Sequence, residues 1–537
     1  MRLFVPQETP PAVRAGLDFI HRADSGRSFL RYEEPHSLQA IIGRSLPRQG
    51  QDFRDVLSEV EELAAGYSVS QSHPRYLAFP DSGNAVAALA GNFFATLLNQ
   101  NLIAVDRSGP AATFIEIQVI EWLRELVGYK VMPLSEMRGL KDVAGLWTTG
   151  GHLSNHVAML AALGRAFPLA RRRGLRSLDK QPAIVMAGPI AHYSHSDAAF
   201  HLGLGWDNVI TVAANTDYTT DVAAVERALA DPPAGLAPFM VVGVAGNSRT
   251  TGLDDLAGLG EVCRRHGVWF HVDACHGGSL IFSERLRRRI AGIDVADSVS
   301  LDPHKGLFTP YPSSYLLLRD RGVLTQFSRH ETTVLDDDCW DLGLITPFIG
   351  SRGFHSLATW MLLRHAGADT LGAIVESRFA LIRYLEGRLA SSRLFVLLND
   401  VDFYRLTFVF CPPSARAAMA RLPAADRQRA VGIISAYTSR LNTALYQGGE
   451  ACFDEHTLAD LDNRVGAGAD LRYTVIAACP GNPLTSKPDL DEAIGCLVER
   501  ATAMVEPLLA EIHQSGSDWT GGHSARTAGP AGWDDVR

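Results

Sequence analysis

The chain has 537 residues, of which 46% are hydrophobic and 20% are charged, so it is long enough to build two or more packed units. Its formal net charge of −9 gives no general attraction for phosphate backbones or anionic lipid, so we expect neither a nucleic-acid nor a membrane partner. The seven cysteines lie singly, without the paired spacing of a zinc site, which favours a reduced, cytoplasmic protein without a bound metal.

The N-terminal segment, residues 1–105, is predicted to be mainly helical. Apolar residues recur near helical spacing from Ser37 to Gly66, and an apolar-rich run extends from Ala85 to Leu98. Gly91 interrupts this run, which is too short to span a bilayer. The first residues lack the charged and apolar regions of a signal peptide, so we expect a soluble protein.

Residues 106–385 are predicted to form a large α/β domain. A helix is expected from Phe114, closing near Gly128. From about Leu146, short apolar runs alternate with Gly-rich turns and amphipathic stretches, which predicts a largely parallel sheet. After the run at Leu146, the expected strands are Ala183–Met186, Val209–Val212, Phe239–Val244, Val268–Val272, Ser298–Leu301 and Tyr315–Leu318.

Residues 386–514 are predicted to form a smaller α+β domain. A helical segment that begins near Leu357 leads into it near Ala390. Its expected strands are Phe395–Leu398, Phe403–Phe410 and Leu471–Ala478. Residues 515–537 are rich in Gly and Ser with little apolar patterning, so we expect a disordered tail.

A lysine and an aspartate each follow a predicted strand. Lys305 stands after the strand at Ser298–Leu301, where open α/β sheets place their ligands. Thirty-two residues earlier (305 − 273), Asp273 ends another strand, and beside a pyridine nitrogen its carboxylate would keep the ring protonated and able to accept electrons. Taken singly, Lys305 could be a solvated surface group and Asp273 a helix N-cap.

Two further elements favour a phosphorylated aromatic cofactor. Gly150, Gly151 and His152 lie between an apolar run and a helix, where backbone N–H groups can bind a phosphate. His192 follows another strand end and offers an imidazole that can stack on a ring. Taken singly, the glycines could form an ordinary turn, and His192 could be a hydrogen-bonded core residue.

The segments TTGGHLSN, AHYSHSDAAFHLGLG, HVDACHGG and SLDPHKG together resemble the group II pyridoxal-phosphate-dependent amino-acid decarboxylases, such as glutamate and aromatic-amino-acid decarboxylases. The likeness runs from His73 to Arg472. It implies fold type I, with a mostly parallel seven-stranded sheet in the large domain. It also implies pyridoxal 5′-phosphate as the cofactor, an amino-acid substrate, and a homodimer with shared active sites.

The resemblance assigns roles to individual residues. Lys305 matches the Schiff-base lysine, Asp273 the partner of the pyridine nitrogen, and His192 the stacking histidine that assists the chemistry. Further cofactor contacts are implied for Gly150, Gly151, His152, Ser248, Cys275, Asp302, His304 and Ser351, the last on the neighbouring subunit's phosphate. Arg472 resembles the arginine that holds the substrate carboxylate in glutamate decarboxylases.

Two departures bear on the reaction. The loop from Arg321 to Gly350 lacks the tyrosine that usually donates the final proton. His330 is the candidate substitute, and the alternative is that it is an exposed loop residue. Phe79 replaces a polar residue of glutamate decarboxylases, which favours an aliphatic or branched substrate such as valine or leucine, then an aromatic one, unless Phe79 belongs to the core.

The sequence therefore predicts a carboxy-lyase that converts an L-amino acid to the amine and carbon dioxide. In some relatives, loss of the loop tyrosine accompanies oxygen-dependent conversion of the amino acid to an aldehyde, which is the first alternative. A protein that binds the cofactor without turnover is the second.

Overall fold

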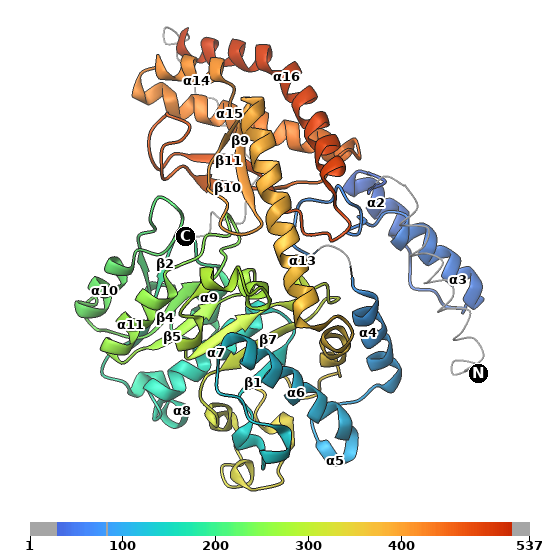
Figure 1. Ribbon diagram of the computed structural model, residues 1–537, viewed down its shortest axis with the longest axis vertical. Helices are drawn as coiled ribbons and strands as arrows, with labels where there is room; N and C mark the ends of the chain where they lie inside the picture. The colour runs from blue at the N-terminus through green and yellow to red at the C-terminus, as the bar shows by residue number, and fades with distance from the viewer. Residues whose placement is uncertain (1–28, 82–83, 518–537) are drawn as a thin grey trace.

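The computed structural model describes residues 29–81 and 84–517, and contains two β-sheets joined by the long helix α13 (Ser356–Ser392) (Figure 1). The predicted boundary at residue 385 falls inside this helix. Within α13, Gly367 has a φ of 74°, a left-handed conformation that kinks the helix and that favours glycine.

The large sheet has seven strands in the order β1-β7-β6-β5-β4-β2-β3. Strand β7 runs antiparallel to its neighbours β1 and β6, and the other neighbouring pairs are parallel. The predicted seven-stranded, mostly parallel sheet is therefore confirmed. The strands are β1 (Gly145–Thr148), β2 (Gln181–Ala187), β3 (Val209–Val212), β4 (Leu236–Val244), β5 (Trp269–Asp273), β6 (Ser298–Leu301) and β7 (Ser314–Leu318).

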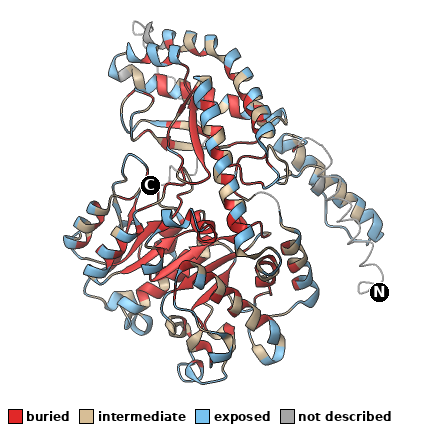
Figure 2. Ribbon diagram, in the orientation of Figure 1, coloured by how far each residue is buried: buried red, intermediate tan, exposed pale blue. Residues whose placement is uncertain are grey.

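Helices cover both faces of this sheet, because successive strand residues are apolar on both sides. In β4, Val241 packs into one core cluster, while Met240 and Val242 pack into the other. Figure 2 shows the strands largely buried between the helices. The helices of this layer are α5 (Val105–Ser108), α6 (Pro110–Val127), α7 (Gly151–Ala166), α8 (Ala170–Arg173), α9 (Ser194–His201), α10 (Val222–Ala230), α11 (Leu256–His266) and α12 (Pro303–Gly306).

The second sheet is antiparallel, in the order β10-β11-β9-β8, and packs against helices. Its elements are β8 (Phe395–Leu397), β9 (Leu406–Phe410), α14 (Pro413–Ala420), α15 (Ala424–Gln447), β10 (Asp454–Ala459), β11 (Arg472–Ala478) and α16 (Lys487–Ser517). Strand β10 was not predicted, because its residues DEHTLA are mostly polar and it lies at the sheet edge. The tail predicted from residue 515 was wrong at its start, since α16 continues to Ser517; residues 518–537 lie outside the described residues.

The described residues of the N-terminal segment form helices separated by loops, whereas residues 1–28 lie outside the described residues. Its helices are α2 (Pro35–Ile42), α3 (Phe53–Val60) and α4 (Val86–Leu98). Gly91 of α4 lies against α13, where an added Cβ would come 2.6 Å from Ala358 Cα, so glycine permits this close helix contact. In the described part of the chain, none of the helices is both long enough and apolar enough to cross a bilayer.

Candidate active site

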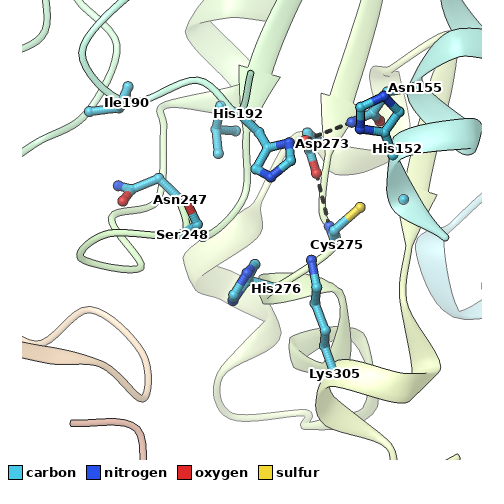
Figure 3. Close-up of a pocket in the computed structure, with 13 residues that line it drawn as sticks. His152, Asn155, Ile190, His192, Asn247, Ser248, Asp273, Cys275, His276 and Lys305 are labelled. Carbon is cyan, nitrogen blue, oxygen red and sulfur yellow. Dashed lines mark hydrogen bonds between the residues drawn. The ribbon is translucent and has the colours of Figure 1, made fainter. Parts of the chain in front are cut away.

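The carboxyl ends of β1, β2, β4, β5 and β6 lie at one edge of the large sheet, where open α/β sheets bind ligands. Residues at or after these strand ends line a pocket that is open to solvent (Figure 3). The lining residues are Gly151, His152, Asn155, Ile190, His192, Val244, Gly246, Asn247, Ser248, Asp273, Cys275, His276 and Lys305.

The structure brings most of the predicted cofactor residues together here. Those that line the pocket are Gly151, His152, His192, Ser248, Asp273, Cys275 and Lys305. Asp302 contacts both Lys305 and His304: its Oδ2 lies 3.2 Å from Lys305 Nζ and 3.5 Å from His304 Nε2. Asp302 and His304 are buried and do not line the pocket themselves, and neither do the other predicted residues, which are half-buried or exposed: Phe79, Gly150, His330, Ser351 and Arg472.

Asp273 is held as a carboxylate. Its Oδ2 accepts hydrogen bonds from Asn155 Nδ2 at 3.0 Å and His195 Nε2 at 3.1 Å, and its Oδ1 accepts one from the Cys275 N–H at 3.1 Å. Burial alone would raise the pKa of this carboxyl, but the hydrogen bond and charge of His195, with the nearby His192, hold it well below the ordinary value. An anionic Asp273 is suited to pair with a protonated ring nitrogen.

Lys305 lies on the single turn α12 that follows β6, and its side chain extends toward Cys275 and Asp273 (Figure 3). Its Nζ is 3.2 Å from Asp302 Oδ2. Burial would lower the pKa of this lysine, but Asp302, Cys275 and Asp273 raise it above its ordinary value. Asp302 is fixed in turn by Ser314, whose Oγ donates to Asp302 Oδ1 at 2.5 Å.

Gly151 opens the first turn of α7 at a point where no side chain fits. An added Cβ would lie 2.3 Å from Cys275 Sγ and 2.9 Å from Asp302 Oδ2. Glycine at this position therefore allows the N-terminus of α7 to pack closely against Cys275 and Asp302, which are neighbours of Asp273 and Lys305. The N–H groups of such a terminus favour an anion, so the site fits a ring nitrogen, an aldehyde and a phosphate in one pocket.

His192 faces the pocket as a neutral imidazole. Burial lowers its pKa to about 4; the charge of Asp273 opposes this effect, and those of Lys305, His195 and His152 add to it. A neutral ring can pack against a flat aromatic cofactor without leaving a buried charge unpaired.

Several residues of the site were not singled out from the sequence. Asn155, His195 and His271 surround Asp273, while Asn247 and His276 line the pocket. Two signals could have found them. His271 is a polar residue between the apolar residues Phe270 and Val272 of a central strand, and it lies two residues before Asp273 on the same face. His195 lies in the first turn of α9, three residues after His192.

Comparison with known proteins decides the family. The model of the pyridoxal-dependent decarboxylase conserved domain matches residues 35–410. The chain belongs to the pyridoxal-dependent decarboxylase family. Among its relatives, cysteine sulfinic acid decarboxylase of Mus musculus is 32% identical over 392 residues, which cover 72% of this chain and 76% of the relative.

Further relatives of this decarboxylase differ in their named substrates. Tryptophan decarboxylase 2 of Oryza sativa subsp. japonica is 27% identical over 398 residues, covering 71% of this chain and 76% of the relative. The crystal structure of mouse CSAD superposes with a TM-score of 0.80 at 27% identity, covering 93% of this chain and 99% of that one. The decarboxylase is thus a carboxy-lyase that uses pyridoxal phosphate, as the sequence predicted.

In the part of the chain that the structure describes, no three His, Cys, Asp or Glu side chains are grouped so as to hold a metal ion.

Proposed function

We propose that Lys305, Asp273 and His192 carry out the decarboxylation of an L-amino acid to the amine and carbon dioxide. The observation that carries the proposal is the convergence of these three side chains, with Gly151, on one pocket. Bound pyridoxal phosphate supplies the electron sink for the electrons left at Cα when carbon dioxide leaves.

The side chains then have separate tasks. Lys305 would hold the cofactor at its aldehyde carbon, and Asp302, which lies 3.2 Å from Lys305 Nζ, would orient that nitrogen. Asn155 and His195 hold the Asp273 carboxylate ionised, and it would keep a proton on the ring nitrogen. Backbone N–H groups at the start of α7, from Gly151 onward, would bind the phosphate. His192 lines the same pocket and would pack against the cofactor ring, which would help to set which bond at Cα is aligned to break.

We further propose a substrate with an uncharged side chain, aliphatic or branched first and aromatic second. Among the described residues that line the pocket, Lys305 is the only lysine or arginine, and in our proposal its amine is committed to the cofactor. Burial lowers the pKa of His152, His192 and His276, which leaves these rings neutral. An acidic substrate needs a cation as partner, and Arg472 lies exposed on β11, outside this pocket.

The proposal is tested with purified enzyme, pyridoxal phosphate and a panel of L-amino acids that includes valine, leucine, tryptophan, glutamate and cysteine sulfinate. We expect carbon dioxide and the matching amine in equal amounts, with valine or leucine the best substrate by kcat/KM. A best substrate with an acidic side chain would overturn the proposed substrate class, and the absence of carbon dioxide from every amino acid would overturn the activity.

Oxygen-dependent conversion to an aldehyde is the second candidate, because residues 321–350 contain no tyrosine. His330 in this loop is our candidate for the missing proton donor, since an imidazole can carry a proton near neutrality. We expect His330→Gln to lower amine formation, whereas Arg329→Gln in the same exposed turn leaves it unchanged. Oxygen uptake with ammonia and aldehyde as products would establish the second candidate instead.

We also propose that the decarboxylase is a cytoplasmic homodimer. Helix α4 packs on α13 with one side and leaves large apolar side chains more than 40% exposed on the other: Val86, Phe93, Phe94, Leu97 and Leu98. A second copy of the chain would cover such a patch. Light scattering of the wild type should give twice the chain mass, and Phe94→Glu should shift it toward the single-chain value; a monomeric wild type would contradict the proposal.

A further inference from the structure

A chain of buried hydrogen bonds links the Asp273 carboxylate to the ring of His192. Asn155 Nδ2 lies 3.0 Å from Asp273 Oδ2 and also 3.0 Å from Ser194 Oγ. Ser194 Oγ in turn lies 2.9 Å from His192 Nδ1. On its other side, Asn155 places Oδ1 3.0 Å from His271 Nε2. Asn155, Ser194 and His271 are at most 1% exposed, so bulk water does not compete for these contacts.

The carboxylate fixes the direction of each hydrogen bond. Asp273 is ionised and can only accept, so Asn155 must turn its NH2 group toward it. The same nitrogen has no lone pair to offer, so it donates its second hydrogen to Ser194 Oγ. Asn155 Oδ1 is then left facing His271 Nε2, which must carry a hydrogen.

The contacts of His271, at the other end of this series of hydrogen bonds, agree with this assignment. Burial, aided by the nearby His195, lowers the pKa of His271 to about 3, so its ring is neutral and its Nδ1 has a lone pair. Ser298 Oγ lies 2.8 Å from this Nδ1 and can donate to it. Trp269 Nε1, which can only donate, lies 2.8 Å from the same hydroxyl. The hydroxyl therefore accepts from Trp269 and donates to His271.

At the near end, two donors are directed at His192 Nδ1. Since Ser194 Oγ accepts from Asn155, its own hydrogen points to this nitrogen, and the Ser194 backbone N–H lies 3.2 Å from it. A nitrogen that accepts both hydrogens must hold a lone pair. We propose that the protein holds His192 as the neutral tautomer with its hydrogen on Nε2, and that Ser194 and Asn155 are the positioning residues that enforce this state.

The role of this tautomer rests on the proposed function. The titratable groups that act electrostatically on His192 are Asp273, Lys305, His195, His152 and His276, and the ring of Tyr193 lies 4.2 Å from that of His192. With Nδ1 occupied by Ser194, Nε2 is the edge left to the pocket. His192 therefore contributes a hydrogen-bond donor rather than an acidic proton, and the proton that reaches Cα has to come from another group.

Neutron diffraction from crystals of the holoenzyme in heavy water tests the tautomer directly. We expect deuterium on Nε2 of both His192 and His271, and a Ser194 hydroxyl directed at His192 Nδ1. Deuterium on His192 Nδ1 would overturn the proposal. This measurement needs no turnover, so its failure is distinct from a failure of the proposed function.

Kinetics supply a second test. Ser194→Ala removes one donor from His192 Nδ1, so the ring becomes easier to protonate and the acid limb of the kcat/KM profile should move up by about half to one pH unit. Ser194→Thr keeps the hydroxyl and should restore the wild-type profile. Ser283→Ala, which removes a buried hydroxyl bonded to Glu376, should leave the profile unchanged. An unshifted Ser194→Ala profile would contradict the proposal.

Discussion

Replacing Gly151 with alanine is expected to close the cofactor site. The added Cβ would lie 2.3 Å from Cys275 Sγ, whereas heavy atoms in good contact stand about 3.5 Å apart or more. The start of α7 would therefore have to move by about 1.2 Å. Overpacking of this kind costs about 1–3 kcal/mol, and a displacement of about 1 Å at a reacting centre lowers the rate by about 10²-fold.

We expect Gly151→Ala to weaken pyridoxal phosphate binding by about tenfold or more, measured by titrating the apoprotein, and to lower kcat by about 100-fold. Gly150→Ala is the matched comparison, because an added Cβ there meets no heavy atom within 4 Å, and its losses should be much smaller. Adding Cys275→Ala to Gly151→Ala removes the closest clash and should recover part of the binding. Equal losses at Gly150 and Gly151 would refute the steric argument.

Further predictions concern the buried charges. Asp273→Asn should lower kcat by about 10- to 100-fold at saturating cofactor, because a charge-assisted hydrogen bond to the ring nitrogen is lost. The pKa of Asp273 is depressed on folding, so its contribution to stability is present above about pH 3.9 and disappears as the pH falls; urea unfolding of wild type and Asp273→Asn should converge at low pH. Arg352→Ala leaves Glu116 buried without its partner, and should cost about 3–5 kcal/mol in urea unfolding. Arg138→Ala breaks only an exposed pair with Asp337, and should cost about 0–1 kcal/mol.

The large sheet could be predicted because its strands are continuous apolar runs. Strands β3 and β6 begin and end where the sequence placed them. Strand β10 could not be predicted, since an edge strand needs no apolar run to be stabilised. The end of α16 could not be predicted either. Its last residues are polar, so their composition placed them in the tail, although the helix continues through them.

The site residues that could be predicted from the sequence are those that stand at or just after the end of a predicted strand. Lys305 and Asp273 stand at strand ends, so their convergence follows from the parallel order of β5 and β6. Asn155 and His195 could not be assigned in the same way, because their roles depend on how α7 and α9 pack over β5. The placement of His330 and Arg472 outside the pocket likewise depends on tertiary structure, and their roles stay predictions.

The bond between the cofactor and Lys305 is the central claim, and borohydride reduction tests it directly. Treating the holoenzyme with borohydride fixes the cofactor to the lysine that holds it, and mass spectrometry of the digest locates the added mass. We predict that the added mass lies on Lys305, and that it is absent from Lys305→Ala treated in the same way. Added mass on another lysine of the wild type, or on none, would contradict the account.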